Sequence, residues 1–252
     1  MIEISIIDRL ILFGMVFLAG FVDSIAGGGG LISLPAYLFV GLPSHNALAT
    51  NKLSSTIGTL FSMIRYAKKG AVVFRIGVPS TIGALVGSVV GARLVLFIPE
   101  SLLKKVLTVL IPVAAFFVLV GKKDANGQNK PRSTLKQYML AFLIGGLIGL
   151  YDGFFGPGTG TFLIILYVSV LSLTHVQASG TAKIVNLASN VGALVTFLIG
   201  NKVIYSLGLP AALFGIIGNW LGTGLALKKG ARIIKPVMIV VLALLMVRII
   251  MR

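Results

Sequence analysis

Four ionisable side chains lie inside otherwise apolar stretches of the 252-residue chain, namely Asp23, Lys52, Asp152 and Lys183. A charged side chain in the middle of a bilayer costs about 2.5 kcal/mol or more, so such residues usually serve a substrate, an ion or a proton. We expect each aspartate to balance the lysine about thirty residues after it when no substrate is bound. The alternative is that these pairs only hold the fold together.

Two glycine-rich segments directly follow the two aspartates. They read "AGGGG" at 26–30 and "FGPGTG" at 155–160. Glycine inside a helix costs about 1 kcal/mol relative to alanine, so both segments predict a break in a membrane helix. The N–H groups at a helix start carry partial positive charge and bind anions without a buried cation. We therefore predict that the two breaks form part of an anion site, with the anion between them.

Hydroxyl and amide side chains surround each lysine. Asn51, Ser54 and Ser55 share one face at helical spacing, and Lys183, Asn186 and Asn190 share another. Such donors suit an oxyanion. The predicted substrate-binding residues are Asp23, Gly28, Gly29, Gly30, Thr50, Asn51, Lys52, Ser55, Asp152, Gly156, Gly158, Thr181, Lys183 and Asn186.

The elements that must position these residues are membrane helices. The chain is 57% hydrophobic and 11% charged, with a mean hydropathy of +1.03. Apolar runs long enough to cross a bilayer follow one another along it, so we predict an all-α polytopic membrane protein. The runs fall near 10–22, 31–42, 46–66, 74–98, 102–120, 135–151, 157–173, 176–200, 203–227 and 233–250. The first run, with Glu3 and Asp8 beside Arg9, reads as a retained span rather than a signal peptide.

The chain contains two copies of one pattern. Residues 75–94 align with 206–225 at an offset of 131, and "ATNK" at 49–52 meets "GTAK" at 180–183 at the same offset. With two residues of insertion, Asp23 falls on Asp152. We predict a first membrane repeat at 1–120, a basic cytoplasmic linker at 121–136 and a second repeat at 137–252.

Basic loops predict how the repeats are oriented. Lysine and arginine gather at 65–75, 121–136 and 228–235, and such loops favour the cytoplasmic side. Placing all three inside gives five crossings per repeat and opposite topology in the two copies, with both termini outside. The short runs 31–42 and 157–173 would then be re-entrant or broken. The competing arrangement, four crossings per copy in parallel, would move the third basic loop outside.

Several other functions are excluded or disfavoured by the residues. The net charge of +16 is explained by the basic loops, so no nucleic-acid partner is expected. The glycine segments match neither a Walker loop nor a GxGxxG fingerprint. No cysteine, histidine-rich metal cluster or nucleophile–base set indicates a metal, a cofactor or an enzyme. We assign helix packing to Gly83, Gly87, Gly91, Gly145 and Gly149, and loop or cap duty to the neighbourhoods of His45 and His175.

The ordered motifs resemble one known family. "GFVDSIAGGGGLISLPAYL" at 20–38, "NALATNK" at 46–52 and "GLYDGFFGPGTGTFL" at 149–163 are similar to the TauE/SafE sulfite exporter family, also called toluene-sulfonate uptake permeases. The resemblance covers nearly the whole chain. It implies a carrier of sulfite, sulfoacetate or related sulfonates built from inverted repeats with re-entrant segments. The second copy departs from the first where Gly28 becomes Pro157 and Asn51 becomes Ala182.

These observations lead to one functional hypothesis with two alternatives. We expect a secondary transporter that moves a small organic or inorganic oxyanion by alternating access, in a multi-pass cell membrane location such as the prokaryotic inner membrane. A coupling proton carried by an aspartate and a homodimer are candidate partners beside the lipid bilayer. An anion channel could use the same helix ends as a selectivity filter. A membrane scaffold would need the buried charges for folding only.

Overall fold

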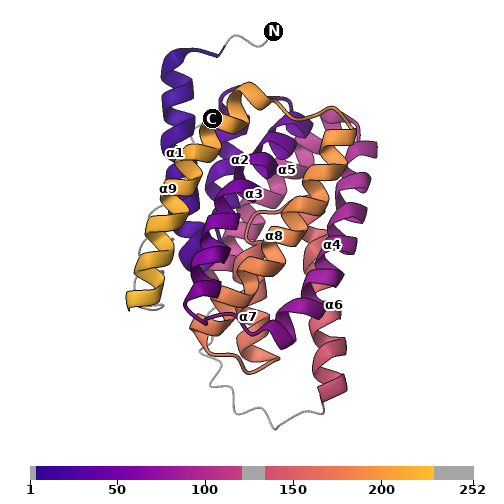
Figure 1. Cartoon of the computed structure of the whole chain (residues 1–252). Helices are drawn as coiled ribbons and strands as arrows, with labels where there is room; N and C mark the ends of the chain where they lie inside the picture. The colour runs from indigo at the N-terminus through magenta and orange to yellow at the C-terminus, as the bar shows by residue number, and fades with distance from the viewer. Residues whose placement is uncertain (1–3, 121–133, 230–252) are drawn as a thin grey trace.

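In the computed structural model, residues 4–120 and 134–229 form helices joined by short turns (Figure 1). No strand occurs in this described part of the chain, which confirms the predicted all-α class. The helices are α1 (Ile6–Ala26), α2 (Gly30–Phe39), α3 (Ser44–Lys68), α4 (Phe74–Phe97), α5 (Glu100–Val120), α6 (Thr134–Phe154), α7 (Thr159–Ser169), α8 (His175–Ile199) and α9 (Tyr205–Lys229).

The glycine segments turn the chain back on itself. After α1 the chain turns at Gly27, whose φ is 78°, and α2 returns towards the end at which it entered. The α6–α7 pair does the same from the other end of the bundle, through Gly156 and Gly158. At 1.5 Å per residue, the 10-residue α2 and the 11-residue α7 reach about half of a 30 Å hydrocarbon layer. Both helices are therefore too short to cross the layer alone, and the re-entrant arrangement stays a prediction.

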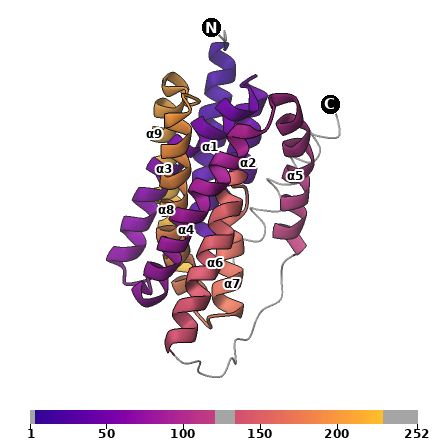
Figure 2. The same ribbon diagram turned by 90° about the vertical axis from the view of Figure 1, so that its right-hand side faces the viewer.

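Corresponding helices of the two copies run in opposite directions. Figure 1 shows α3 descending and α8 rising, and Figure 2 shows α5 at the edge of the bundle. Two matching hydrogen bonds follow the repeat: Thr50 Oγ1 accepts from Ile204 N at 3.0 Å, and Thr181 Oγ1 accepts from Val73 N at 3.0 Å. The described helices have the order and directions expected of inverted repeats. The predicted last crossing at 233–250 lies outside the described residues.

The basic ends of the helices gather on one side. The end of α3 at Lys68, the start of α6 at Thr134 and the end of α9 at Lys229 lie at the same end of the bundle. The predicted linker ended at 136, whereas α6 already begins at Thr134, because the apolar run after it extends the helix backwards. Residues 121–133 of that linker lie outside the described part.

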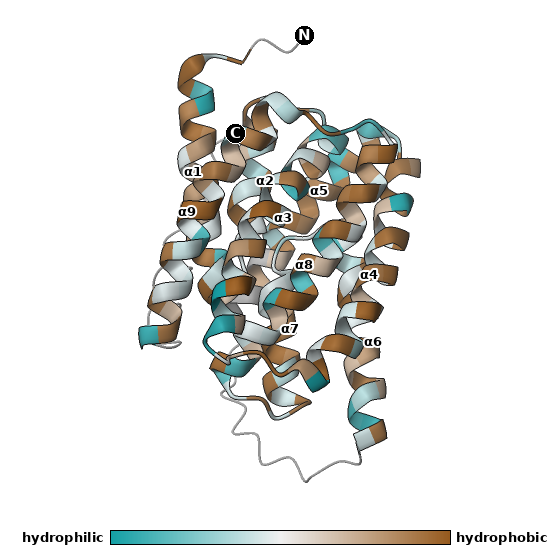
Figure 3. Cartoon of the chain, in the orientation of Figure 1, coloured by the Kyte–Doolittle hydropathy of each residue, from teal (hydrophilic) through white to brown (hydrophobic). Residues whose placement is uncertain are grey.

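The surface of the bundle is apolar along its length. In Figure 3 hydrophobic residues dominate the outward sides, and hydrophilic residues gather towards helix ends. Within the described residues, α4, α6, α8 and α9 are long and apolar enough to cross a membrane. On α4 the exposed residues Val78, Ile82 and Val86 recur every fourth position, as a lipid-facing stripe requires. The polar stripe of α3 is instead buried inside the bundle.

The stripe of glycines on α4 packs directly on α6. A Cβ atom on Gly83, Gly87 or Gly91 would collide with backbone atoms of α6, and one on Gly149 would lie 2.5 Å from Ala84 Cα. Glycine and small residues allow such close approach of membrane helices. Gly145 makes the same kind of contact, with the backbone of Ser80. The predicted packing role of these five glycines is confirmed. The same kind of glycine packing occurs between α9 and α1. A Cβ atom on Gly218 or Gly222 would collide with backbone atoms of α1.

Substituting Gly87 by alanine is expected to lower the melting temperature in detergent by several degrees. The added methyl group would meet the carbonyl oxygen of Gly146, and two packed helix backbones cannot shift cheaply. Gly146→Ala is the matched control, because its Cβ would find only Gly83 atoms, at 3.8 Å or more. Equal melting temperatures for the two variants would contradict the tight α4–α6 contact.

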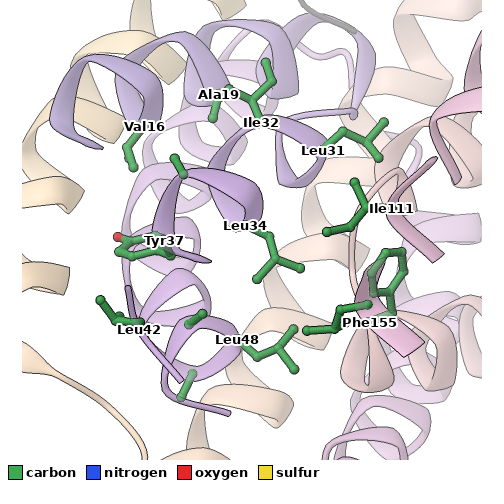
Figure 4. Packing of buried hydrophobic residues seen from close by; sticks show 14 of the residues in the cluster. Val16, Ala19, Leu31, Ile32, Leu34, Tyr37, Leu42, Leu48, Ile111 and Phe155 are labelled. Carbon is green, nitrogen blue, oxygen red and sulfur yellow. The ribbon is translucent and has the colours of Figure 1, made fainter. Parts of the chain in front are cut away.

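A cluster of buried apolar side chains anchors the first hairpin. Figure 4 shows Leu34 of α2 at the centre of the cluster, with Tyr37 on one side and Leu48 of α3, Ile111 of α5 and Phe155 of the second hairpin turn on the other. Tyr37 donates its hydroxyl to Ser54 Oγ at 2.9 Å, which satisfies the polar end of a fully buried ring. The cluster therefore fixes α2 and its glycine turn against the polar helix α3.

The start of α3 is capped by a residue from α5. Glu100 accepts hydrogen bonds from Ser44 N at 2.5 Å and His45 N at 3.4 Å, and it contacts His45 Nδ1 at 2.8 Å. Burial alone would raise the pKa of Glu100, but these hydrogen bonds outweigh it and hold the pKa below its ordinary value. In the second copy, Thr174 and Gln177 form the capping box at the start of α8. Both histidine neighbourhoods thus have the predicted capping role.

Replacing Glu100 by glutamine is expected to lower the melting temperature at pH 7 by about 2–4 °C. A carboxylate with a lowered pKa stabilises the fold above its unfolded pKa and loses that contribution as pH falls through the folded value. The difference between wild type and variant should therefore shrink below about pH 4. Melting curves between pH 7 and pH 3 test this. A difference that grows on acidification would contradict it.

Candidate functional site

Two buried ion pairs join the two repeats. Lys52 Nζ lies 2.7 Å from Asp152 Oδ2, and Lys183 Nζ lies 2.6 Å from Asp23 Oδ2. The expectation that each aspartate balances the lysine about thirty residues after it is wrong, because each pair links one repeat to the other. The repeats interlock, so the hairpin turn of one copy lies against the lysine-bearing helix of the other.

The Lys52 pair is enclosed by neutral polar groups. Lys52 Nζ also donates to Asn190 Oδ1 at 2.9 Å, and Thr159 Oγ1 donates to Asp152 Oδ1 at 2.8 Å. Lys52 is 3% exposed and Asp152 is 2% exposed. An ammonium group has three N–H donors, and these two partners use two of them. The third remains for another acceptor.

The Lys183 pair is tied to the backbone. Lys183 Nζ donates to the carboxylate of Asp23 and also to the backbone oxygen of Asp23, both at 2.6 Å. That oxygen belongs to the last turn of α1, where carbonyl groups carry partial negative charge. Gly29 N donates to the other carboxylate oxygen at 3.4 Å. These contacts hold the end of α1 against α8 and against the first hairpin turn.

The two glycine turns touch each other. A Cβ on Gly160 would lie 2.5 Å from Gly27 Cα, and one on Gly30 would lie 3.0 Å from Pro157 Cα. Thr161 Oγ1 donates to the backbone oxygen of Ala26 at 2.6 Å. An anion was expected between the breaks, but the backbones fill that space. The open volume lies beside the joined turns.

A polar cavity lies beside the joined turns, between α1, α3, α8 and α9. It holds about 540 Å³ of empty space, its open side included. Both re-entrant helices point their N-terminal ends at it, through Gly30 of α2 and Thr159 of α7. Its lining consists of Val16, Ala19, Gly20, Asp23, Gly27, Gly29, Gly30, Ser33, Asn51, Lys52, Ser54, Ser55, Thr59, Asp152, Gly156, Thr159, Gly160, Asn186, Asn190, Gly215 and Asn219.

Comparison with known proteins identifies the family. Residues 12–249 match the family described as "Sulfite exporter TauE/SafE". The chain belongs to the TauE/SafE family.

Its relatives are named as membrane transporters. A probable membrane transporter protein of Sinorhizobium sp, ORF9, is 37% identical over 94% of this chain and 90% of its own length. YfcA of Escherichia coli K12 is 35% identical over 93% of this chain and 87% of its own. A probable membrane transporter protein of Haemophilus influenzae is 36% identical over 95% and 93%. No solved structure matches. This TauE/SafE chain is a multi-pass membrane transporter.

Nine of the predicted site residues of this TauE/SafE protein line the cavity. They come from both hairpins and from the polar faces of α3 and α8. Their convergence supports the predicted site without testing binding. The nine are Asp23, Gly29, Gly30, Asn51, Lys52, Ser55, Asp152, Gly156 and Asn186.

The five other predicted site residues lie outside the lining. Thr50 and Thr181 are fully buried, and their hydroxyl groups accept the backbone bonds that precede α9 and α4. Lys183 is 1% exposed and is held by Asp23. Gly28 and Gly158 belong to the turns but are not among the residues that line the cavity. The structure gives these residues structural contacts instead of a place in the cavity.

Twelve lining residues were absent from the predicted set, and six of them have polar side chains: Ser33, Ser54, Thr59, Thr159, Asn190 and Asn219. Ser54 and Asn190 belong to the polar faces already noted beside the two lysines. Thr59 stands four residues after Ser55, so extending the polar stripe by one helical turn finds it. Asn219 is an isolated amide in the apolar helix α9. Its Nδ2 donates to Gly215 O at 3.0 Å, while Oδ1 has no partner within the described residues. That oxygen adds an acceptor beside the cavity that local sequence does not reveal.

The chemistry available in the cavity is recognition rather than bond breaking. An ammonium group, amide groups, hydroxyl groups and the starts of two helices line a small volume, and groups of these kinds donate to oxyanions. The hydroxyl groups of Ser54, Ser55 and Thr159 already donate to acceptors within the protein. Within residues 4–120 and 134–229, no group of three or more His, Cys, Asp or Glu side chains could hold a metal ion. The arrangement fits an anion-binding site in a transporter.

Proposed function

We propose that this TauE/SafE protein is a secondary transporter of small oxyanions, namely sulfite, sulfoacetate or another small sulfonate, working by alternating access. The observation that carries the proposal is the position of Lys52. Its ammonium group lines a cavity at the point where two half-length helices from opposite sides direct their N-termini. Binding at such broken helices between inverted repeats is a recurrent design of secondary transporters.

The donors around the cavity support an oxyanion with several acceptor oxygens. Lys52 has one N–H direction left after Asp152 and Asn190. Asn51, Ser55 and Asn186 add neutral donors from α3 and α8. Neutral donors stabilise an anion without adding buried charge that would then need its own partner.

The lining also favours a compact substrate. Glycine backbone, hydroxyl and amide groups make up most of it, and its apolar side chains are Val16 and Ala19. Among the described residues, no aromatic side chain lines this cavity, so a ring-bearing sulfonate would find no surface there on which to stack. We therefore place sulfite and short alkyl sulfonates ahead of aromatic sulfonates, in a prokaryotic inner membrane.

Alternating access would arise from relative motion of two helix units, each of which combines helices from both copies. The helix pairs α1–α9 and α4–α6 are each locked by glycine contacts, so each pair can move as a unit. The joined turns and the two ion pairs lie where these units meet. Rocking about that point would expose the cavity to one side of the membrane at a time.

The test is uptake of labelled anions into proteoliposomes that contain the purified chain. The panel is sulfite, sulfoacetate, methanesulfonate and toluenesulfonate, with protein-free vesicles as the background. Saturable uptake of the small sulfur oxyanions, exceeding toluenesulfonate uptake at least tenfold, is the expected result. Accumulation against a gradient identifies a transporter. Fast flux that never saturates and never accumulates would show a channel instead, and uptake of none of the four anions would refute the proposed function.

A further inference from the structure

The lysine that faces the cavity is already occupied by an internal anion. Lys52 and Asp152 form a closed pair at 2.7 Å, and both are almost completely buried. An incoming oxyanion must therefore share Lys52 with Asp152 or take it from Asp152.

The charges around Asp152 come from three helices. Lys52 approaches from α3, Asp23 lines the same cavity from α1, and Lys183 of α8 is bonded to Asp23. The lining residues from α2, α7 and α9 are neutral. On α4, which packs against α6, the arginines at 75 and 93 lie near the two ends of the helix. Within the described residues, the site thus holds two positive and two negative groups.

Adding a monoanion to this balanced set leaves one uncompensated negative charge. Removing one partner of a buried ion pair strongly destabilises a protein, because the remaining charge is left unpaired. Among the described residues, Asp152 once released by Lys52 would retain the hydroxyl of Thr159 as its side-chain partner. A cation must enter with the anion to avoid this cost. A proton fits without any further space, because the carboxylate itself can accept it.

We propose that Asp152 is the proton-binding site of the transporter, and that one proton binds there for each monoanion that Lys52 accepts. The O–H bond forms on Oδ2, the oxygen that Lys52 vacates. Asn190 Oδ1 lies next to the same ammonium group and accepts from it in the empty state. It offers the new O–H group an acceptor once Lys52 turns to the substrate. This inference rests on the proposed function and assigns its coupling ion.

Asp23 does not share this role, although it occupies the equivalent place in the repeat. Its lysine partner, Lys183, does not line the cavity and is also held by the backbone oxygen of Asp23. A ligand in the cavity therefore cannot take Lys183 from Asp23. Asp23 keeps its partner throughout. The two pairs are alike in sequence and unlike in geometry.

The experiment measures binding and uptake of methanesulfonate as a function of pH. This probe is a strong-acid anion, so its own charge stays constant across the range. In the wild type, affinity should weaken tenfold for each unit of rising pH over the range in which the empty site holds no proton, as linkage to one proton requires. Uptake into proteoliposomes should accumulate the anion when the outside is more acidic.

Asp152→Asn should remove the pH dependence of binding, leaving the affinity near its low-pH value. It should also remove accumulation driven by a pH gradient, while exchange of labelled for unlabelled anion continues. Asp23→Asn is the matched variant from the other repeat. In the folded fraction of this variant, the affinity for methanesulfonate should still weaken tenfold per pH unit. Asp152→Glu keeps a titratable group and should shift the midpoint of the dependence without changing its slope.

Each result decides the matter. Transport by the wild type without any pH dependence would overturn this inference and leave the proposed function standing. Persistence of the pH dependence in Asp152→Asn, or its loss in Asp23→Asn, would also overturn it. If Asp152→Asn fails to fold, an unshifted midpoint in Asp152→Glu would have the same consequence. Binding of neither methanesulfonate nor sulfite by the folded wild type at any pH would refute the proposed function itself.

Discussion

Replacing Lys52 by methionine is expected to reduce anion uptake at least about 100-fold, which corresponds to the loss of roughly 2.7 kcal/mol of substrate interaction. Methionine keeps most of the length of the side chain and removes its charge. The reason for the large effect is position, because Lys52 is the lysine whose ammonium group lines the cavity. Uptake of labelled sulfite or methanesulfonate by proteoliposomes, normalised to folded protein, measures it.

The same substitution leaves Asp152 buried without its charged partner, so the variant should also lose stability. The double variant Lys52→Met with Asp152→Asn removes both charges and should recover much of the melting temperature. It should not recover uptake. This separation of folding from transport is what a binding role predicts and a purely structural role does not. Wild-type uptake by the folded double variant would contradict the assigned site.

The other lysine provides the comparison. Lys183→Met should lower the melting temperature strongly, since Lys183 ties Asp23 and the end of α1 to α8. The double variant Lys183→Met with Asp23→Asn should recover stability and retain measurable uptake, because Lys183 lies outside the cavity lining. Equal loss of uptake in both double variants would show that the two ion pairs contribute equally to transport, which would contradict the distinction drawn between them.

Substituting Gly27 by alanine is expected to have the second largest effect. Gly27 has a φ of 78°, and a Cβ there would collide with the backbone of Gly160 in the opposite hairpin. The left-handed conformation alone costs a non-glycine residue about 1–2 kcal/mol. The collision adds to this, because the two turns are held together by the bond from Thr161 to Ala26. We expect the free energy of unfolding to fall by several kcal/mol and uptake per folded molecule to fall at least tenfold.

Gly41 supplies the control for backbone strain. Its φ is 88°, and a Cβ there would meet nothing within 4 Å. Gly41→Ala should therefore lower the melting temperature by about 2–4 °C and leave uptake unchanged. Melting curves and uptake of the two variants side by side isolate the turn-to-turn contact. If Gly27→Ala behaves like Gly41→Ala, that contact has no importance for folding or transport.

Much of the architecture could be predicted because it follows from local chemistry. Long apolar runs require helices in a bilayer, and four successive glycines end a helix wherever they occur. The positions of lysine and arginine near loops predicted which ends of α3, α6 and α9 lie together. The candidate site was partly accessible for the same reason. Asp23, Lys52 and Asp152 could be identified because a charge inside an apolar segment is costly and is usually retained for a function.

The sequence by itself determined that this is an all-helical membrane protein with two broken hairpins, buried charges and a polar stripe on α3. These are properties of segments, set by solvation and by backbone propensity. Only the tertiary structure decided that each lysine pairs with the aspartate of the other repeat, that the glycine turns touch, and that Lys52 rather than Lys183 faces the cavity. Two charges interact over a few ångströms, and separation along the chain does not determine separation in space. Which charges meet depends on how the helices interlock.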